Sequence, residues 1–330
     1  METLVFEQEL KERTRLAEEV LKKYLPAEGG PQGRLTEAMN YSLLAGGKRL
    51  RPVLMRETYE MCGGQEEDPA LEAFMAAIEM IHTYSLVHDD LPAMDNDCYR
   101  RGKKTTWYVY GDAMGILAGD GLLNYAFETA AGALTRCCQG EGIPEGERMA
   151  GLKRISEAFS VLARKAGIYG MIGGQAVDIM DSENQTAVAE NGNQAPEDKG
   201  GEPQELERLL FIHEHKTAAL IQAAMMIGAI LAGAAPQKVR EIEKCAYNIG
   251  IAFQIQDDVL DVVGNSQELG KSIGSDAQNN KRTYVALMGL DRAKADVEAL
   301  SQEAVDILDG FQGRHEFLKQ LILALIHRTH

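Results

Sequence analysis

Apolar residues recur at spacings of three and four along most of the chain, which is the period of an amphipathic α-helix. This pattern predicts helices over residues 3–24, 35–45, 69–91, 111–134, 147–169, 205–232, 237–263, 292–309 and 315–327. Strand-like alternation bounded by turn residues is almost absent, so the pattern predicts an all-α protein. The stretch 239–263 is apolar on most faces, which is typical of a helix at the centre of a bundle.

One segment, residues 182–204, has no apolar period. It reads SENQTAVAENGNQAPEDKGGEPQ and is rich in glycine, asparagine, glutamine and glutamate. Such a composition cannot bury enough apolar surface to order the chain, so we predict a mobile surface loop between two helices and not a domain linker.

Composition and charge narrow the class of protein. The 330 residues carry a net charge of −16, from 34 basic and 50 acidic residues, which argues against general nucleic-acid binding. The five cysteines show no CxxC or zinc spacing, so they are expected to be reduced thiols in a cytoplasmic protein. The charged N-terminus is unlike a signal peptide, and no apolar run of about 18 residues predicts a membrane span.

Two acidic motifs stand out, because the chain has only two Asp-Asp pairs and each is followed by a further aspartate. The first is Asp89-Asp90 with Asp95, where Pro92 should end the helix and let the chain return toward Asp89. The second is Asp257-Asp258 with Asp261, four residues along one helix face, about 6 Å apart along the axis. Two such clusters on separate helices of one bundle can face each other across a cavity.

Hard carboxylate oxygens without a His/Cys pattern suit Mg²⁺, which takes one or two carboxylates together with substrate phosphates. A single Asp-Asp pair is more often a helix end or a solvated turn, and the recurrence of the whole theme favours the metal site. Basic residues lie near both motifs and in two further segments: Lys48, Arg49, Arg51, Arg100, Arg101, Lys103, Lys104, Lys216, Lys271 and Lys281. Together these groups predict a diphosphate ligand.

The motifs LVHDDLPAMDND…RRG, GGQAVDI, HKTAALI, FQIQDDVLDVVG and GKSIGSDAQNNKRTYVAL resemble, in order, those of the short-chain trans-isoprenyl diphosphate synthases. The similarity runs from about residue 34 to 288 and is nearest to the bacterial branch that makes farnesyl diphosphate. It implies a single domain over residues 1–330, in which ten or more helices surround a deep central cavity. It also implies a homodimer and an enzyme of the prenyltransferase class, with no nucleic-acid or membrane partner.

The resemblance also implies a role for each matching residue. Mg²⁺ ligands would be Asp89, Asp95, Asp257 and Asp261, with Asp90 and Asp258 in the same motifs. The allylic diphosphate would be held by Arg100, Lys216 and Lys271, and isopentenyl diphosphate by Lys48, Arg51, His82, Arg101 and Lys281. Gln175, Thr217 and Gln254 would line the cavity beside a developing carbocation. Three Mg²⁺ ions are expected, with Mn²⁺ able to substitute.

In such enzymes the diphosphate leaves, the isopentenyl double bond attacks the allylic cation in a dry cavity, and a proton is lost to the departed diphosphate. No dedicated side-chain base is therefore expected. Tyr84 lies five residues before Asp89, about 7.5 Å along the helix. In the family, an aromatic residue there, with two extra residues between the aspartates, acts as a floor that stops the chain at C15. The alternative for Tyr84 is a packed core tyrosine with a bonded hydroxyl.

This sequence departs from the family at four positions. Cys98 stands where an aspartate is usual, Lys104 and Trp107 replace a proline and a histidine, and Val285 replaces a proline. Trp107 is expected to reshape the wall near the first motif. The loop over 182–204 is longer than usual.

Several alternatives stay open. A C20, geranylgeranyl-producing synthase and a non-catalytic subunit of a heteromeric synthase belong to the same family. A His-Asp metal phosphohydrolase would use His88-Asp89 with His82 and His213, but the histidines lack metal spacing. A P-loop enzyme is suggested only by Gly264…Gly270-Lys271-Ser272, at the wrong spacing. A terpene cyclase would usually lack the second motif and the GGKRLRP turn.

Overall fold

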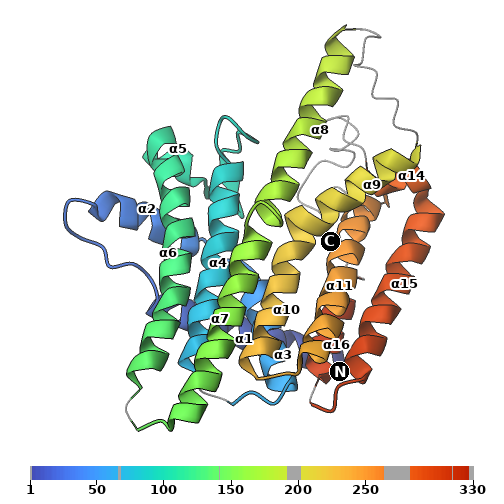
Figure 1. Cartoon of the computed structure of the whole chain (residues 1–330). Coiled ribbons are helices and arrows are strands. Elements are labelled where there is room, and N and C mark those ends of the chain that lie inside the picture. The colour runs from blue at the N-terminus through green and yellow to red at the C-terminus, as the bar shows by residue number, and fades with distance from the viewer. Residues whose placement is uncertain are drawn as a thin grey trace. The chain divides into compact units, whose positions relative to one another are not determined.

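The computed structural model describes residues 2–65, 68–140, 142–191, 202–263, 283–313 and 315–326. Its helices are α1 (Glu2–Lys23), α2 (Gly33–Leu43), α3 (Leu50–Met61), α4 (Pro69–Asp89), α5 (Thr106–Tyr110), α6 (Asp112–Gln139), α7 (Glu145–Ala166), α8 (Met171–Asn191), α9 (Glu202–Ile212), α10 (Ala219–Leu231), α11 (Pro236–Val263), α14 (Tyr284–Met288), α15 (Leu290–Asp309) and α16 (Glu316–Ile326). A π-helix, η1 (His213–Ala218), joins α9 to α10. Figure 1 confirms the all-α prediction, and the described residues add one hairpin, β1 (Tyr99–Arg100) with β2 (Lys103–Lys104).

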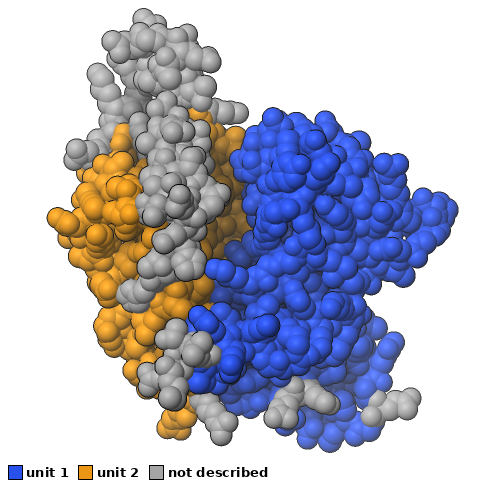
Figure 2. All heavy atoms as spheres, turned by 180° about the vertical axis from the view of Figure 1, so that it is seen from behind, with its two compact units in different colours: residues 1–163, 226–235 blue, residues 164–225, 236–330 orange. Residues whose placement is uncertain are grey.

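Internal contacts divide the chain into two compact units, coloured in Figure 2. Unit 1 comprises residues 1–163 and 226–235, and unit 2 comprises residues 164–225 and 236–330. The first acidic motif lies in unit 1 and the second in unit 2. A single domain over the whole chain, as expected from the sequence, stays a prediction.

The core of unit 1 is built around α4, which packs mainly against α6 (Figure 1). The carboxylate of Asp68 caps its first turn, accepting the N–H of Ala70 at 2.8 Å. Most α4 side chains are buried, among them Phe74, Ile78 and Ile81. Gly119 of α6 lets the two helices approach, since a Cβ there would collide with the ring of His88.

The core of unit 2 is built around α11, which packs against α15 and η1. Its inner face carries Ile249, Ala252 and Ile255, all buried. Gly250 lies against Ala218 of η1, and a Cβ at this glycine would collide with the alanine side chain. The absence of a side chain therefore sets how closely α11 approaches the π-helix.

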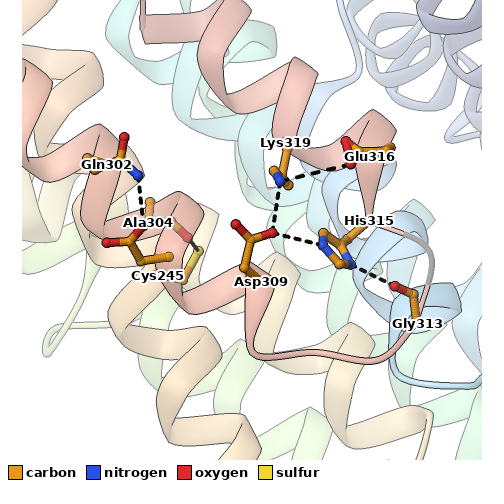
Figure 3. A network of polar contacts seen from close by, with 9 residues as sticks. Cys245, Gln302, Ala304, Asp309, Gly313, His315, Glu316 and Lys319 are labelled. Carbon is orange, nitrogen blue, oxygen red and sulfur yellow. Dashed lines mark hydrogen bonds and ion pairs between the residues drawn. The ribbon is translucent and has the colours of Figure 1, made fainter.

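A surface network holds the turn between α15 and α16 (Figure 3). Lys319 donates to the carboxylate of Asp309 at 2.8 Å, and His315 lies 3.2 Å from the same carboxylate. The other ring nitrogen of His315 lies 2.6 Å from the carbonyl of Gly313. The hydrogen bonds from Lys319 and His315 lower the pKa of Asp309, so the carboxylate stays charged and ties α16 to the end of α15.

Two helices are longer than the sequence pattern predicts. The predicted loop over 182–204 is wrong at both ends, because α8 continues to Asn191 and α9 begins at Glu202. Residues 183–191 are rich in alanine, glutamate and glutamine, which favour helix without an apolar face. The remainder of the predicted loop lies outside the described residues.

Five shorter features were not predicted, and two of them are the five-residue helices α5 and α14, which are too short to show a helical period. The helical period does not reveal α3, because Pro52–Met55 is a continuous buried run without helical spacing. Its proline lies in the first turn of the helix, where a missing N–H is tolerated. The six residues of η1 interrupt what the sequence predicts as one helix over 205–232. The hairpin is too short to show strand alternation.

Among the described residues, α4 is long and apolar enough to cross a membrane by length and composition, contrary to the expectation of no such segment. Its 18-residue window has a mean hydropathy of 1.2, and 72% of that window is buried inside the protein. A buried core helix passes the same test, so this single helix is weak evidence for a membrane span.

Candidate active site

The first acidic loop, residues 89–97, begins where α4 ends. The helix stops at Asp89, shortly before Pro92, as predicted from the proline. The chain then turns back, and the N–H of Asp95 donates to the carbonyl of Asp89 at 2.8 Å. Asn96 has a φ of 56°, a left-handed conformation that asparagine tolerates better than most residues. The predicted return of Asp95 toward the end of the helix is confirmed.

The hairpin that follows this loop carries two arginines. Its turn is Arg101-Gly102, with φ values of 52° and 73°, the positive pair that suits a two-residue hairpin. The Nε of Arg100, in β1, donates to the carboxylate of Asp90 at 2.6 Å. Only 6% of the Asp90 side chain is exposed, against 31% for Arg100. Asp90 is therefore the internal partner of Arg100, not a third outward-facing carboxylate.

A small cavity of about 40 Å³ lies beside this ion pair, between the end of α2, α4 and the hairpin. Its walls include Asp90, Arg100 and Arg101, with Thr83 and Thr106. The cavity is larger than a single water needs, so the two guanidinium groups have open space beside them.

The charge state of Asp90 depends on two opposing causes. Burial raises the pKa of its carboxyl to about 6, while the hydrogen bond and the charge of Arg100 act in the lowering direction. The neighbouring carboxylates of Asp97 and Asp89 add to the rise. Asp90 therefore changes its charge just below neutral pH, within the range where an enzyme works.

A cluster of basic groups from α3, α4 and the hairpin forms a positive region in unit 1. Burial lowers the pKa of His82 well below its usual value, and the charges of Arg51 and Arg101 lower it further. Burial also lowers the pKa of Arg51 to about 10, and its Nε has no hydrogen-bond partner within the described ranges. Two cations and a neutral imidazole held this close, with a buried donor left over, suit an anionic ligand.

The turn before α3 does not present all its basic groups to a ligand. Arg49 is interior: its Nη1 donates to Glu79 at 2.8 Å, and 3% of each side chain is exposed. The two glycines of the turn lie against the side chain of Arg101. The guanidinium of Arg101 donates to the carbonyl of Gly46, and a Cβ on Gly47 would collide with this guanidinium. Lys48 of this turn is exposed.

Tyr84 is a buried residue of α4, with 5% of its surface exposed. Its ring meets that of His88 edge-on, with centroids 5.8 Å apart. Within the part of the chain described, its buried hydroxyl has no hydrogen-bond partner, unlike the bonded hydroxyl of the alternative in which Tyr84 is only a packed core residue. Burial, with the charge of Asp89, raises the pKa of the phenol, so it stays neutral.

In unit 2, Lys216 lies within η1, and π-helical turns are frequent at functional sites. Its Nζ donates to the carboxylate of Asp178 in α8 at 2.5 Å. Gly174, one turn earlier in α8, permits this contact, because a Cβ there would collide with the backbone nitrogen of Lys216. The sequence did not single out Asp178, although it lies in the GGQAVDI motif, four residues after Gly174.

His213, at the start of η1, is 6% exposed, and its Nδ1 has no hydrogen-bond partner in the described structure. Burial lowers its pKa to about 4, although the charge of Asp178 opposes the shift. The ring is therefore neutral at physiological pH. No group of three or more His, Cys, Asp or Glu side chains is arranged to hold a metal among the residues searched.

The second acidic motif lies near the end of α11. Asp257 and Asp261 are four residues apart in one continuous helix, as predicted, and Gln254 donates to Asp257 at 3.3 Å. Asp258 accepts the N–H of Tyr284 at 2.6 Å, at the first residue of α14. The middle aspartate of this motif therefore fixes the start of α14 to α11.

The aspartates fit magnesium that is bound together with a diphosphate. Each motif supplies two outer carboxylates, and magnesium in phosphate-handling sites takes one or two carboxylates and completes its shell with phosphate and water. The middle acids, Asp90 and Asp258, are each engaged by the protein. The donors suit an ion that arrives with its substrate, not a preassembled cage of protein ligands.

For four of the predicted site residues the structure adds little to the sequence. Gln175 lies on α8 and Thr217 in η1, both partly buried. Lys271 and Lys281 lie outside the described residues, as does the stretch 264–272 that suggested a P-loop.

An all-α fold with two aspartate motifs, the first of them paired with Arg100, is typical of enzymes that handle prenyl diphosphates, and comparison with known proteins supports this. The polyprenyl synthetase family matches residues 32–317. A farnesyl diphosphate synthase from Geobacillus stearothermophilus is 44% identical over 295 residues, which is 89% of this chain and 88% of that protein. The large subunit of a heterodimeric geranylgeranyl pyrophosphate synthase from Arabidopsis thaliana is 44% identical, covering 84% of this chain and 67% of that protein.

Solved structures agree with these sequences. An FPP/GFPP synthase from Zymomonas mobilis superposes with a TM-score of 0.76 at 29% identity, covering 98% of this chain and 99% of that one. A geranyltransferase from Helicobacter pylori, complexed with magnesium and isoprenyl diphosphate, gives 0.72 at 29% identity, covering 97% and 95%. The chain belongs to the polyprenyl synthetase family. It is a prenyltransferase, and the isoprenoid synthase fold is confirmed.

Proposed function

We propose that this prenyltransferase is a magnesium-dependent farnesyl diphosphate synthase that joins isopentenyl diphosphate to dimethylallyl and then geranyl diphosphate. The observation that carries the C15 product is the buried aromatic ring of Tyr84 on α4, five residues before Asp89 at the start of the first acidic loop. The relative from Geobacillus stearothermophilus supports the same product.

In this proposal the allylic diphosphate is held by two acidic motifs and two cations. Asp89, Asp95, Asp257 and Asp261 hold magnesium, which supplies Lewis-acid stabilisation of the leaving diphosphate. By the family resemblance, Arg100 and Lys216 would bind the same diphosphate, and each is oriented beforehand by a carboxylate of its own unit, at 2.6 Å and 2.5 Å. Preorganised charges of this kind lower the barrier most, because they need no reorganisation as charge develops. Lys271 would join them.

Isopentenyl diphosphate is assigned to the basic cluster of unit 1. Arg51 and Arg101 supply positive charge, and the neutral ring of His82 supplies an N–H donor without further repulsion. Lys48, exposed on the adjoining turn, reaches the ligand from the solvent side, and Lys281 completes the set.

The organic step needs no side-chain base. Gln175, Thr217 and Gln254 present amide and hydroxyl oxygens to the allylic cation, and the apolar wall keeps water away from it. The proton lost after condensation passes to the departed diphosphate.

Product length is the finer part of the proposal, and a C20 product is its alternative. Relatives named as farnesyl and as geranylgeranyl synthases match this chain at equal identity, so the argument rests on the side chain at position 84. Tyr84→Ala is expected to shift the product toward C20, while Tyr84→Phe, which keeps the ring, should still stop at C15. A C15 product from Tyr84→Ala would remove the floor assignment.

The reaction itself is tested with purified protein, labelled isopentenyl diphosphate and dimethylallyl diphosphate, with magnesium, with manganese and with a chelator. A C15 product that disappears with the chelator supports the proposal, and a metal titration checks the expected three ions. Failure of all condensation would favour the alternative of a non-catalytic subunit of a heteromeric synthase.

We further propose that the enzyme is a cytoplasmic homodimer. The supports are the family resemblance and the lack of any paired cysteine spacing in the sequence. Light scattering on the purified chain should give twice the mass of 36.2 kDa, and fractionation of cells should recover the protein with the cytoplasm.

A further inference from the structure

The carbonyl of Asp97, at the end of the first acidic loop, accepts two side-chain hydrogen bonds from one short segment. The hydroxyl of Thr105 donates to it at 2.7 Å and the indole N–H of Trp107 at 2.9 Å. Thr105 is 3% exposed, and its own N–H donates to the carbonyl of Cys98 at 3.0 Å. Two donors on one carbonyl fix the place where the loop ends.

The rest of the loop is closed by its own backbone. The N–H of Asp97 donates to the carbonyl of Asp90 at 3.2 Å, and the N–H of Asn96 to that of Leu91 at 3.0 Å. A displacement of Asp97 is therefore transmitted to the turn that carries Asp95 and to the backbone that carries Asp90. The Nη2 of Arg100 is also 3.6 Å from the carboxylate of Asp97. The hydrogen bonds that fix Asp97 therefore also influence the position of this arginine.

Trp107 is held firmly enough to act as an anchor. Its Cβ lies against α6 at Gly115, where an added Cβ would come within 2.9 Å of it. Its ring meets that of Tyr108 nearly at right angles, with centroids 5.7 Å apart. Both the glycine and the short helix α5 therefore support the indole that reaches the loop.

We propose that Trp107 is a positioning residue for the first acidic loop, setting the spacing of Asp89 and Asp95 for a magnesium–diphosphate ligand through the carbonyl of Asp97. This inference rests on the proposed function of that loop. It gives a structural reason for a tryptophan where related sequences carry a histidine, since the larger ring reaches the end of the loop while packing on α6.

The chain contains one tryptophan, so its emission reports on this contact alone. Adding magnesium and inorganic diphosphate together to the full-length protein should change the emission of Trp107. The same addition to Asp95→Asn should leave the emission unchanged. An unchanged signal in the wild type, at concentrations where calorimetry shows binding, would overturn the coupling.

Calorimetry with magnesium and inorganic diphosphate tests the energetic side. Trp107→Phe keeps an aromatic ring but loses the indole N–H and part of the ring that packs beside α6, so we expect binding to be weaker by at least about fivefold, the net value of one hydrogen bond. Thr105→Val should give a loss of similar size, and the double variant a larger one. The matched control is Tyr110→Phe, which removes a 3.2 Å hydrogen bond from the same helix to Glu37 without touching the loop.

The outcomes separate this inference from the proposed function. Weaker diphosphate binding in Trp107→Phe, with the KM for isopentenyl diphosphate unchanged and the control unaffected, supports the positioning role. Wild-type affinity in Trp107→Phe, or an equal loss in Tyr110→Phe, overturns it even if prenyl condensation proceeds normally. If the wild type makes no prenyl product but its emission and affinity respond as described, the proposed function fails and the positioning role stands.

Discussion

Each acidic motif combines an Asp-Asp pair with a further aspartate, but the two are held in different ways. In unit 1 the aspartates lie on a loop whose shape depends on backbone bonds, such as the 2.8 Å bond from Asp95 to Asp89. In unit 2 they lie on α11, where the helix itself sets the spacing of Asp257 and Asp261. The loop motif needs outside anchors to keep its geometry, whereas the helical one needs only an intact α11.

The motifs agree in one respect, which is the use of the middle aspartate. Asp90 takes the guanidinium of Arg100 and Asp258 takes the N–H of Tyr284, each at 2.6 Å. The middle acid thus holds the local structure together in both motifs, and the family resemblance assigns metal binding to the outer acids. This division of labour can be tested by substitution.

The largest expected effect is the loss of an outer acid. Asp89→Asn, Asp95→Asn and Asp257→Asn should each lower turnover by about 10²–10³-fold, because an amide replaces a charged oxygen that stabilises the leaving group. Steady-state rates at several magnesium concentrations give the measurement. Asp90→Asn serves as the comparison and should change the magnesium requirement far less. An equal rise in the magnesium requirement for Asp90→Asn would break the distinction between outer and middle acids.

The next effect concerns pH and the buried Asp90. Its pKa is raised from 3.8 to about 6 by burial, so the folded state binds this proton more tightly than the unfolded chain. The group adds stability that is complete below about pH 3.8 and is lost as pH rises to about 6. The amide of Asp90→Asn resembles the protonated acid. The free energy of unfolding of this variant should therefore rise, relative to that of the wild type, by up to about 3 kcal/mol over that range.

Urea unfolding of both proteins between pH 4 and 7 measures this difference. Asp95→Asn, an exposed member of the same loop, is the control and should show no such trend. If the free energy of unfolding of the wild type instead rises relative to that of Asp90→Asn with rising pH, the pairing with Arg100 outweighs the cost of burial.

A smaller effect is expected from the acid that holds Lys216. Asp178→Asn should lower kcat/KM about tenfold, since a charge-assisted hydrogen bond of about 1.5 kcal/mol no longer orients the ammonium. The matched control is Asp181→Asn, which breaks the 2.5 Å ion pair between α8 and Arg208. Equal losses in the two variants would point to a general weakening of α8 and not to positioning of Lys216.

The smallest effect concerns the support of the second motif. Thr283 caps α14, its hydroxyl accepting the N–H of Ala286 at 3.2 Å, next to the residue that bonds Asp258. Thr283→Ala should lower the free energy of unfolding by about 1 kcal/mol. Thr36→Ala, which removes a hydroxyl bonded within α2, is the control for urea unfolding. A drop in magnesium affinity would show that the helical motif also depends on an outside anchor.

Much of this could be predicted from local pattern. Long helices such as α4, α6 and α11 follow from apolar spacing, because that spacing reports one buried face. The return of Asp95 follows from the proline that ends α4. The sequence did not reveal α3, whose buried run lacks a period, or the length of α8, whose last turns rest on helix propensity alone.

The sequence by itself determined the helical class, the two acidic motifs and the family. Tertiary structure decided which partner each charged group has: Arg49 pairs with Glu79, Asp90 with Arg100, and Asp178 with Lys216. The physical reason is that pairing depends on burial and on close approach between elements distant in the chain. That approach is set by positions such as Gly47 and Gly174, whose missing side chains matter only once another element lies against them.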